Sequence, residues 1–387
     1  MGQVEKRALK RLAFLKGKGR QRRLWRPLAL EKKPAIDLSH NDYLNLNGMK
    51  NHQKAMLLAA SSQTMGAKAS RLLGKEHELF CALEEDFAAF KGAKAALFFG
   101  AGYAANEALM AALSHKEVCF FLDELCHASL IEGMRHSPLP RALKRVFPHN
   151  DLNALENMLK ENKERGLTNI IVTEALFSMD GDFAPIEGIL RLARLYNGFL
   201  VLDEAHSIGA LGASGAGLLQ ELGISHKDII TINPCGKAMG AQGAFICGPL
   251  WLKEYMVSTS RKFIYSTAPS PWVARGLQVS LPVVAKMTEE RRVLRAKARK
   301  LKKALCQLGY ETGGSESHII PVVLGSEKQA VESAAFLAAK GVYVAAVRPP
   351  TVPAGTSRLR LSVHLGICEE EMQQVILAFK ALKEADL

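Results

Sequence analysis

The chain has 387 residues, of which 48% are hydrophobic and 23% are charged, an ordinary composition for a globular enzyme with room for two or three domains. No apolar run approaches the roughly 18 residues of a membrane-spanning helix, and the basic N-terminus lacks the apolar core of a signal peptide. The seven cysteines form no C-x-x-C pair, which argues against a disulfide framework or a zinc site. We therefore expect a cytoplasmic protein that binds no metal and no membrane.

The net charge of +13 is concentrated near the start of the chain. Residues 1–33 contain twelve Lys or Arg against two Glu, so +10 of the total lies there (12 − 2). Leu9, Leu12 and Leu15 among these bases predict a short amphipathic helix within a basic segment, residues 1–40. Nucleic-acid binding and organellar targeting are two interpretations. We favour a third, in which the segment attracts an acidic partner or an anionic substrate, with no nucleic acid bound.

Helical and strand patterns alternate from about residue 54 to residue 250. Helical spacing marks residues 78–90, and continuous apolar runs predict strands at 95–99, 118–122, 169–174, 199–203, 228–232 and 243–247. Continuous apolar strands alternating with helices are typical of a mainly parallel sheet covered on both faces. We assign this α/β domain to residues 41–270.

The remaining residues, 271–387, predict a bridging helix and a smaller α+β domain. A long helical tract spans Pro271 to Leu308. After it we expect a strand at 318–324, a helix at 329–340, strands at 343–347 and 358–364, and a final helix from Glu369.

An acid and a lysine follow two of the predicted strands. Asp203 ends the strand 199–203, and Lys237 lies in a turn between Gly236 and Gly240. Pyridoxal 5′-phosphate (PLP) needs such a pair, because the lysine forms a Schiff base while the carboxylate keeps the pyridine nitrogen protonated. Helicase-type ATPases also contain Asp-Glu-Ala-His, but the phosphate loop G-x-x-x-x-G-K-[ST] that they carry is missing from this sequence.

Three further strand ends offer groups suited to a cofactor. Gly102 and Tyr103 open a helix whose backbone N–H groups suit a phosphate. His127 follows the strand 118–122 and could lie against a ring, although a capping or core histidine is the alternative. Ser178 follows the strand 169–174 and could bond a hydroxyl or a phosphate. Cys126 and Cys235 lie beside these residues, and we expect both to be small buried packing groups.

Across residues 36–380 the sequence resembles the α-oxoamine synthases, a branch of the fold-type I PLP-dependent transferases. The matching segments are 38–44 (LSHNDYL), 69–72 (ASRL), 147–151 (FPHND), 177–182 (FSMDGD), 203–206 (DEAH), 236–237 (GK), 264–267 (IYST) and 348–356 (RPPTVPAGT). Together these segments are highly specific for the family.

The resemblance implies a set of site residues. The residues expected to be catalytic are Lys237, His127 and Asp203. Those expected to bind PLP are Gly102, Tyr103, His127, Ser178, Asp203, His206, Lys237, Ser266 and Thr267, of which the serine and threonine at 266 and 267 could come from a second subunit. Those expected to bind substrate are Asn41, Arg360, Thr351 and Arg22, with Arg358 as a competitor of Arg360 for the amino-acid carboxylate.

The resemblance also implies a reaction and its partners. Residues 348–353 favour the branch that condenses L-alanine with a pimeloyl thioester of CoA or acyl carrier protein. If the thioester is carried by the acidic acyl carrier protein, the basic segment could bind that carrier through Arg20, Arg22 and Arg23. Family members are homodimers. The alternatives are branches that join glycine to acetyl-CoA or succinyl-CoA, or serine to a long acyl chain. From another class, a basic nucleic-acid-binding module with a decayed cofactor site is the alternative.

Two positions depart from the family pattern. Pro234 stands where the family has a phosphate-binding threonine three residues before the lysine, and Thr231 could replace it only if the strand shifted. Lys68 stands in a segment that is glycine-rich in the family. These departures bear on cofactor affinity and on acyl preference.

Overall fold

The computed structural model describes residues 2–22, 36–74 and 77–385. The chain forms two compact units, a large unit of residues 41–178 and 183–293 and a small unit of residues 1–40, 179–182 and 294–387. The ranges 1–40, 41–270 and 271–387 stay a prediction about separate domains.

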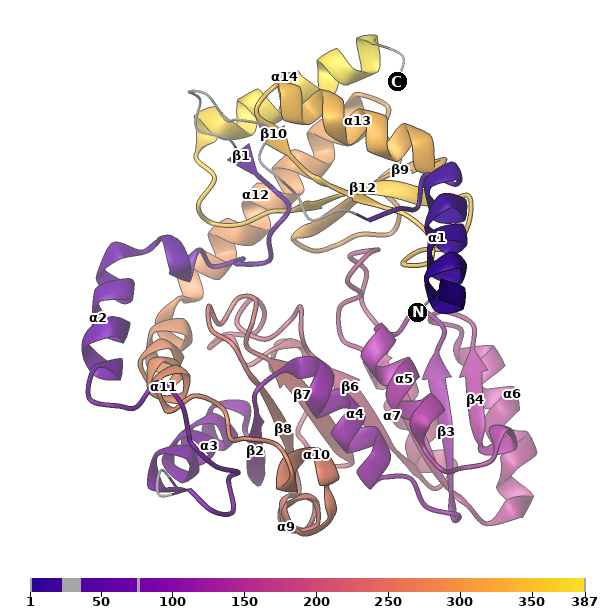
Figure 1. Ribbon diagram of the computed structural model, residues 1–387, viewed down its shortest axis with the longest axis vertical. Coiled ribbons are helices and arrows are strands. Elements are labelled where there is room, and N and C mark those ends of the chain that lie inside the picture. Colours follow the sequence, from indigo (N-terminus) through magenta and orange to yellow (C-terminus); the bar gives the residue numbers. More distant parts are fainter. Residues whose placement is uncertain (1, 23–35, 75–76, 386–387) are drawn as a thin grey trace. The chain divides into compact units, whose positions relative to one another are not determined.

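A seven-stranded sheet forms the centre of the large unit (Figure 1). Its strands, in spatial order, are β2 (Ala95–Phe99), β8 (Ala244–Gly248), β7 (Ile229–Pro234), β6 (Gly198–Asp203), β5 (Thr168–Glu174), β3 (Val118–Asp123) and β4 (Lys144–Phe147). Strand β8 is antiparallel to both of its neighbours, and the other neighbouring pairs are parallel. The apolar runs that predicted the central strands are almost wholly buried, as expected for a sheet covered on both faces.

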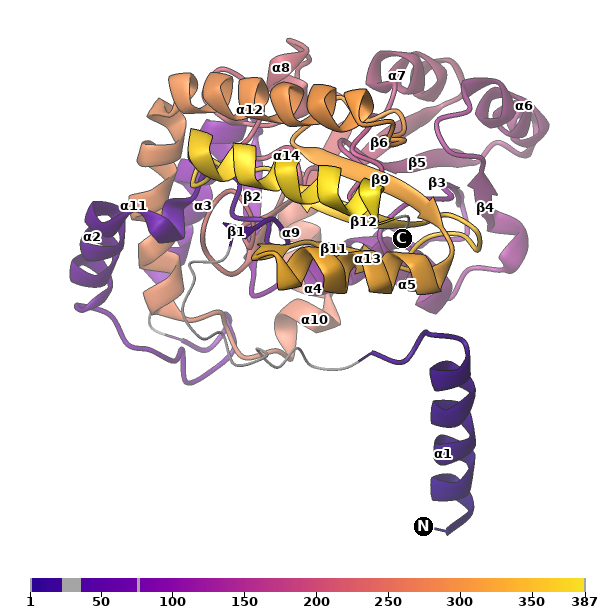
Figure 2. The same ribbon diagram turned by 90° about the horizontal axis from the view of Figure 1, so that it is seen from above.

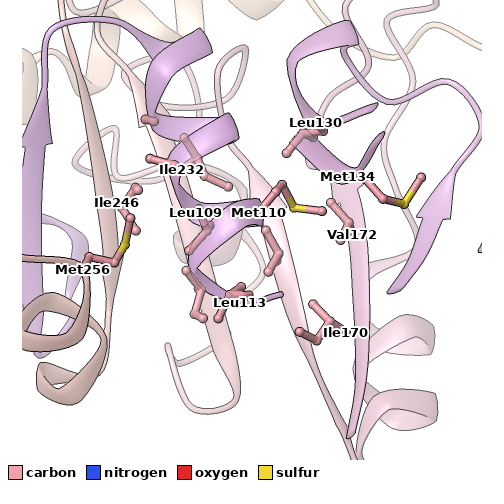
Figure 3. Close-up of a cluster of buried hydrophobic side chains, with 14 of the residues drawn as sticks. Leu109, Met110, Leu113, Leu130, Met134, Ile170, Val172, Ile232, Ile246 and Met256 are labelled. Carbon is pink, nitrogen blue, oxygen red and sulfur yellow. The ribbon is translucent and has the colours of Figure 1, made fainter. Parts of the chain in front are cut away.

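Two hydrophobic clusters cover the two faces of this sheet. One joins the strands to α4 (Gly102–Ala112), α5 (Ala128–His136), α9 (Leu250–Thr259) and α10 (Arg261–Ile264), and Figure 3 shows part of it. The other joins them to α6 (Leu152–Asn162), α7 (Ile186–Leu195) and α8 (Leu218–Glu221). Each fully buried leucine, isoleucine or phenylalanine contributes about 1.5–3 kcal/mol, so these clusters stabilise the packing of the helices on the sheet.

The large unit also contains α2 (Lys50–Ala60), α3 (His77–Lys91), α11 (Pro271–Lys286) and three short 3-10 helices, Leu46–Gly48, Arg141–Leu143 and Lys163–Arg165. Helix α11 packs against α2 and α3.

The small unit is built on an antiparallel sheet in the order β11 (Ala345–Val347), β12 (Ser357–Ser362) and β9 (Ile319–Gly325). Helix α13 (Glu327–Ala339) packs on this sheet and against α14 (Glu369–Glu384), as Figure 2 shows. A separate parallel pair joins β1 (Ile36–Asp37) to β10 (Val342–Tyr343). Helix α1 (Gly2–Gly17) lies in the basic segment, and most of α12 (Thr288–Gln307) belongs to this unit.

The prediction of a mainly parallel sheet with helices on both faces and a smaller α+β part is confirmed. Several element boundaries were wrong. The tract Pro271–Leu308 is two helices, because Met287 leaves helical geometry (ψ 45°) and Glu289 and Glu290 favour a new N-terminus. The strand 343–347 is divided between β10 and β11, which pair in different sheets.

The sequence analysis also missed two short strands. Strand β4 is mostly half-exposed and β1 has two residues, so neither produces a periodic signal. Among the described residues of the basic segment, Gly2–Gly17 is helical, and this short helix contains the predicted Leu9, Leu12 and Leu15. Within the described part of the chain, no helix has the length and apolarity needed to cross a membrane.

Candidate active site

Lys237 lies at the start of a hydrogen-bonded chain in the large unit. Its Nζ is 2.7 Å from His206 Nε2, and His206 Nδ1 is 2.6 Å from the hydroxyl of Tyr43. That hydroxyl donates to Asn41 Oδ1 at 3.0 Å. Since the tyrosine proton goes to Asn41, His206 donates from Nδ1 to Tyr43, and its Nε2 can accept a proton from Lys237. The arrangement therefore gives the lysine a neighbour that can take up or return a proton.

Asp203 is a buried carboxylate at the end of β6. Its side chain is held by two donors, Asn106 Nδ2 at 2.8 Å on Oδ2 and the backbone N–H of Ala205 at 2.9 Å on Oδ1. Asp203 is 3% exposed, so these two donors hold its carboxyl group in place within the buried end of β6. A buried, ionised carboxylate is what a protonated pyridine nitrogen requires.

His127 precedes α5 and caps it, which is the alternative weighed from the sequence, and its place against a cofactor ring stays a prediction. Its Nδ1 accepts from the backbone N–H of Ser129 at 3.2 Å and lies 2.7 Å from the Ser129 hydroxyl. Burial lowers the pKa of His127, Lys237 lowers it further, and Asp203 opposes both. The ring of Tyr103 meets His127 edge-on, with centroids 6.3 Å apart.

Glu174 places a second carboxyl group beside Asp203. The two residues are paired in register on the neighbouring parallel strands β5 and β6, and Glu174 is 2% exposed. Burial and then the charge of Asp203 raise the pKa of Glu174 to about 8. Its Oε1 has no hydrogen-bond partner, so no donor stabilises a negative charge on that oxygen.

The raised pKa of Glu174 predicts a pH-dependent stability. A group whose pKa rises on folding from 4.5 to about 8 binds more protons in the folded state, so the free energy of unfolding falls as pH rises through this window. Glu174→Gln removes the titration. Its stability relative to wild type should therefore rise between pH 4.5 and 8 and stay constant above, which urea unfolding at several pH values will measure. A difference that does not change with pH would contradict the assignment.

The N-terminus of α4 offers an anion site. Ala101 caps the helix without a side-chain hydrogen bond, so the first backbone N–H groups have no side-chain acceptor from the cap. A Cβ on Gly102 would lie 2.9 Å from Cγ of Pro234, which shows that only glycine fits between this helix and β7. Together with Lys237 and Asp203, these features provide a covalent anchor, a ring partner and a phosphate cradle, so the residues present fit PLP.

The departures from the family pattern have clear structural positions. Thr231 stays in β7, fully buried, where its hydroxyl accepts from Asn233 at 2.9 Å, so it does not replace the missing threonine. Pro234 instead packs beside Gly102. Lys68 has a positive φ of 64°, a conformation that glycine adopts readily.

Three other predicted cofactor residues lie at the surface or in a loop. Ser178 is partly buried in the turn that follows β5. Ser266 and Thr267 are exposed, and the segment around them pairs with Ala69 and Ser70. Their contribution to PLP binding stays a prediction.

The small unit holds the predicted substrate residues Arg22, Thr351 and Arg360. Arg22 Nη2 donates to the Thr351 hydroxyl at 2.9 Å, so two residues more than 300 positions apart meet. Arg360 is 4% exposed and donates to Ser362 Oγ at 2.5 Å. Arg358 is ion-paired with Asp180 at 2.5 Å and donates to the carbonyl of Met179, so its charge is already neutralised within the small unit.

The basic segment is attached to the small unit through its arginines. Arg20 donates twice to Glu327, from Nε at 3.0 Å and Nη2 at 2.7 Å, and Arg348 donates to the carbonyl of Gly19 at 2.6 Å. Arg20 is therefore partly neutralised. Arg23, also expected to contact an acidic carrier, lies outside the described residues.

Sequence reasoning missed the groups that support the predicted side chains. Asn106 follows Gly102 and Tyr103 in the same helix and was assigned no function, although it donates to Asp203. Glu204 was quoted only as part of the Asp-Glu-Ala-His segment, yet it forms a fully buried ion pair with Lys91 at 3.0 Å. A polar residue inside an otherwise apolar helix or strand end was the available signal.

The prediction for the two cysteines is confirmed. Cys126 is 4% exposed and Cys235 is fully buried. Burial raises the pKa of both thiols, so neither is a reactive thiolate. Among the residues that the structure describes, no cluster of three or more His, Cys, Asp or Glu could hold a metal ion.

The class of protein follows from a comparison with known families. The description "Aminotransferase class I and II" matches residues 33–379, and the chain belongs to this family.

Individual relatives are similar over nearly the whole chain. 8-Amino-7-oxononanoate synthase of Geobacter sulfurreducens is 37% identical over 350 residues, which cover 90% of this chain and 88% of the relative. Serine palmitoyltransferase from S. paucimobilis, solved with a bound PLP–myriocin aldimine, gives a TM-score of 0.88 at 25% identity over 98% of this chain and 97% of that one. 8-Amino-7-oxononanoate synthase from Francisella tularensis gives a TM-score of 0.77 at 26% identity over 91% and 98%.

Proposed function

We propose that this protein is a PLP-dependent acyltransferase that makes 8-amino-7-oxononanoate from L-alanine and a pimeloyl thioester, a step of biotin biosynthesis. The observation that carries the proposal is the contact of the partly buried Lys237 with His206 in the unit that also contains the buried carboxylate Asp203. Its support is the name of relatives at 37% identity that cover 90% of the chain.

Different residues of the large unit would bind different parts of PLP. Lys237 would anchor it covalently, Asp203 would face its ring nitrogen, and His127 would lie against the ring. The N-terminus of α4 at Gly102 would receive the phosphate. When bound, PLP supplies an electron-withdrawing ring that stabilises negative charge on the α-carbon of an amino acid.

Lys237 is also the residue that would move the α-proton. Its amine accepts a proton only when it is neutral, and His206 Nε2 at 2.7 Å can take the surplus proton. Tyr43 holds the His206 ring through Nδ1, and Asn41 in turn accepts from Tyr43. A shift of either residue would misplace the base, so this order of contacts supports proton transfer at Lys237 Nζ.

The substrate carboxylates would be held by arginines. Arg360 and Asn41 are our candidates for the carboxylate of alanine. Arg22 and Thr351, which already meet at 2.9 Å, are our candidates for the distal end of the pimeloyl chain. Ser178, His206, Tyr103, Ser266 and Thr267 complete the proposed PLP contacts, and we further propose a cytoplasmic homodimer that accepts CoA or acyl carrier protein thioesters.

The test is a substrate assay with purified protein, PLP and pimeloyl-CoA. L-Alanine, glycine and L-serine are supplied separately, and released CoA and the product mass are measured. We expect turnover with alanine and a product with the mass of 8-amino-7-oxononanoate. Turnover with glycine or serine alone would assign the chain to another branch, whereas PLP binding without turnover on any of the three would contradict the synthase proposal.

A further inference from the structure

Four side chains in the large unit form one continuous hydrogen-bonded chain. His127 Nδ1 lies 2.7 Å from Ser129 Oγ, Ser129 Oγ lies 2.8 Å from Asn106 Nδ2, and Asn106 Nδ2 lies 2.8 Å from Asp203 Oδ2. The members come from the loop before α5, from α5, from α4 and from the end of β6. Ser129 is fully buried and Asn106 is 2% exposed, so water does not complete these contacts.

The hydrogens in this chain can run in one direction. The ionised carboxylate of Asp203 only accepts, so the amide of Asn106 must turn its NH₂ group toward it. The second hydrogen of the same nitrogen points to Ser129 Oγ. In this orientation the amide oxygen of Asn106 is buried with no hydrogen-bond partner, which costs free energy. A flipped amide would cost more, because its oxygen would then face the carboxylate of Asp203.

The same donor and acceptor assignments determine which nitrogen of the His127 ring carries the proton. Because Ser129 Oγ accepts from Asn106, its own hydrogen is available for His127 Nδ1. The backbone N–H of Ser129 also donates to Nδ1, at 3.2 Å, and a backbone N–H cannot accept. Two donors therefore meet at Nδ1, which must be the unprotonated nitrogen of the ring.

The charged groups around His127 are compatible with a neutral ring. Lys237 repels a proton on it, while Asp203 attracts one and is already bonded to Asn106 and Ala205. Glu174 accepts a hydrogen bond from the backbone of His127 rather than from its ring. Burial is the largest influence, and it disfavours the charged ring.

We propose that Asn106 and Ser129 are positioning residues that transmit the charge state of Asp203 to His127 and hold its ring as the neutral Nε2–H tautomer. The benefit of this tautomer rests on the proposed function, because a neutral imidazole ring can lie against PLP without placing a second positive charge beside the protonated pyridine nitrogen that Asp203 would hold. The Nε2–H remains as a donor whose orientation is fixed. Asp203 would thus determine both the protonation of the cofactor and the tautomer of the histidine.

The experiment records long-range ¹H–¹⁵N correlation spectra of ¹⁵N-histidine-labelled full-length protein, with PLP bound and after its removal. His127→Gln assigns the His127 signals. We expect the Nε2–H pattern at neutral pH in wild type. Ser129→Ala should raise the His127 titration midpoint by about half to one pH unit, because one donor to the neutral Nδ1 is lost. Ser129→Thr, which keeps the hydroxyl, should restore the wild-type midpoint.

Asn106→Leu should also raise the midpoint, because the Ser129 hydroxyl is then no longer oriented toward His127. Ser114→Ala, in which a hydroxyl bonded to the carbonyl of Met110 in the same α4 region is removed, should leave it unchanged. An Nδ1–H tautomer in wild type overturns the proposal without any variant. An unchanged midpoint in folded Ser129→Ala also overturns it, and both readings are independent of whether the synthase reaction occurs.

Discussion

Replacement of Lys237 by alanine should lower kcat/KM by about four orders of magnitude or more, equivalent to roughly 5 kcal/mol of transition-state stabilisation. The reason is that the variant loses the covalent anchor and the base together. It also leaves His206 without the amine that lies 2.7 Å from Nε2. Steady-state kinetics with alanine and pimeloyl-CoA, together with the visible absorbance of bound PLP, will measure both losses.

Lys94→Ala is the matched control for this variant. Lys94 is an exposed lysine of the same unit, so its loss should leave kinetics and absorbance unchanged. Retention of more than about one hundredth of wild-type kcat/KM by Lys237→Ala would show that another group moves the proton.

The largest loss of stability is expected from the buried ion pair between Lys91 and Glu204. Both side chains are fully buried, and Glu204 also accepts from the Ser207 hydroxyl and the backbone N–H of Leu218. Glu204→Gln leaves the lysine charge buried and unpaired, which costs about 3–5 kcal/mol. Gly217 explains why the pair is so tightly enclosed, since a Cβ there would lie 1.8 Å from Glu204 Oε2.

Urea unfolding and thermal unfolding of Glu204→Gln will measure this cost. Lys300→Ala is the comparison, because its partner Glu369 and Lys300 itself are about half exposed and such pairs contribute about 0–1 kcal/mol. Similar losses in the two variants would refute the conclusion that burial makes the Lys91–Glu204 pair important.

The sequence was sufficient for the groups that stand at strand ends. Lys237, Asp203, His127 and Gly102 each follow a buried apolar run, and parallel strands bring their carboxyl ends to one edge of a sheet. Periodicity thus placed these residues at strand ends, whereas their expected functions came from the family resemblance and stay a prediction. The registers of β5 and β6 add what periodicity cannot supply, the pairing of Glu174 with Asp203, whose charge adds to burial in raising the pKa of Glu174.

Contacts between distant segments could not be predicted in the same way. Ser129 and Asn106 are 23 positions apart, and their meeting depends on how α4 packs against α5. The bond between Arg22 and Thr351 spans 329 positions. Each requires the packing of complete elements, whereas helix and strand patterns report only on neighbours in the chain.

Each of the two units is built from separate stretches of the chain, and this limits where the gene can be cut or recombined. The small unit takes residues 1–40, 179–182 and 294–387, so neither unit is encoded by one uninterrupted stretch. Residues 179–182 carry Gly181, whose carbonyl accepts from the backbone of Glu316, and Asp180, which neutralises Arg358. A fragment ending at Val293 would contain Gly181 and Asp180 but lack Glu316 and Arg358. A fragment beginning at Leu294 would leave the Arg358 guanidinium without its counter-ion Asp180. Recombination between related genes should therefore preserve function only when the exchanged blocks carry residues 179–182 together with the C-terminal segment.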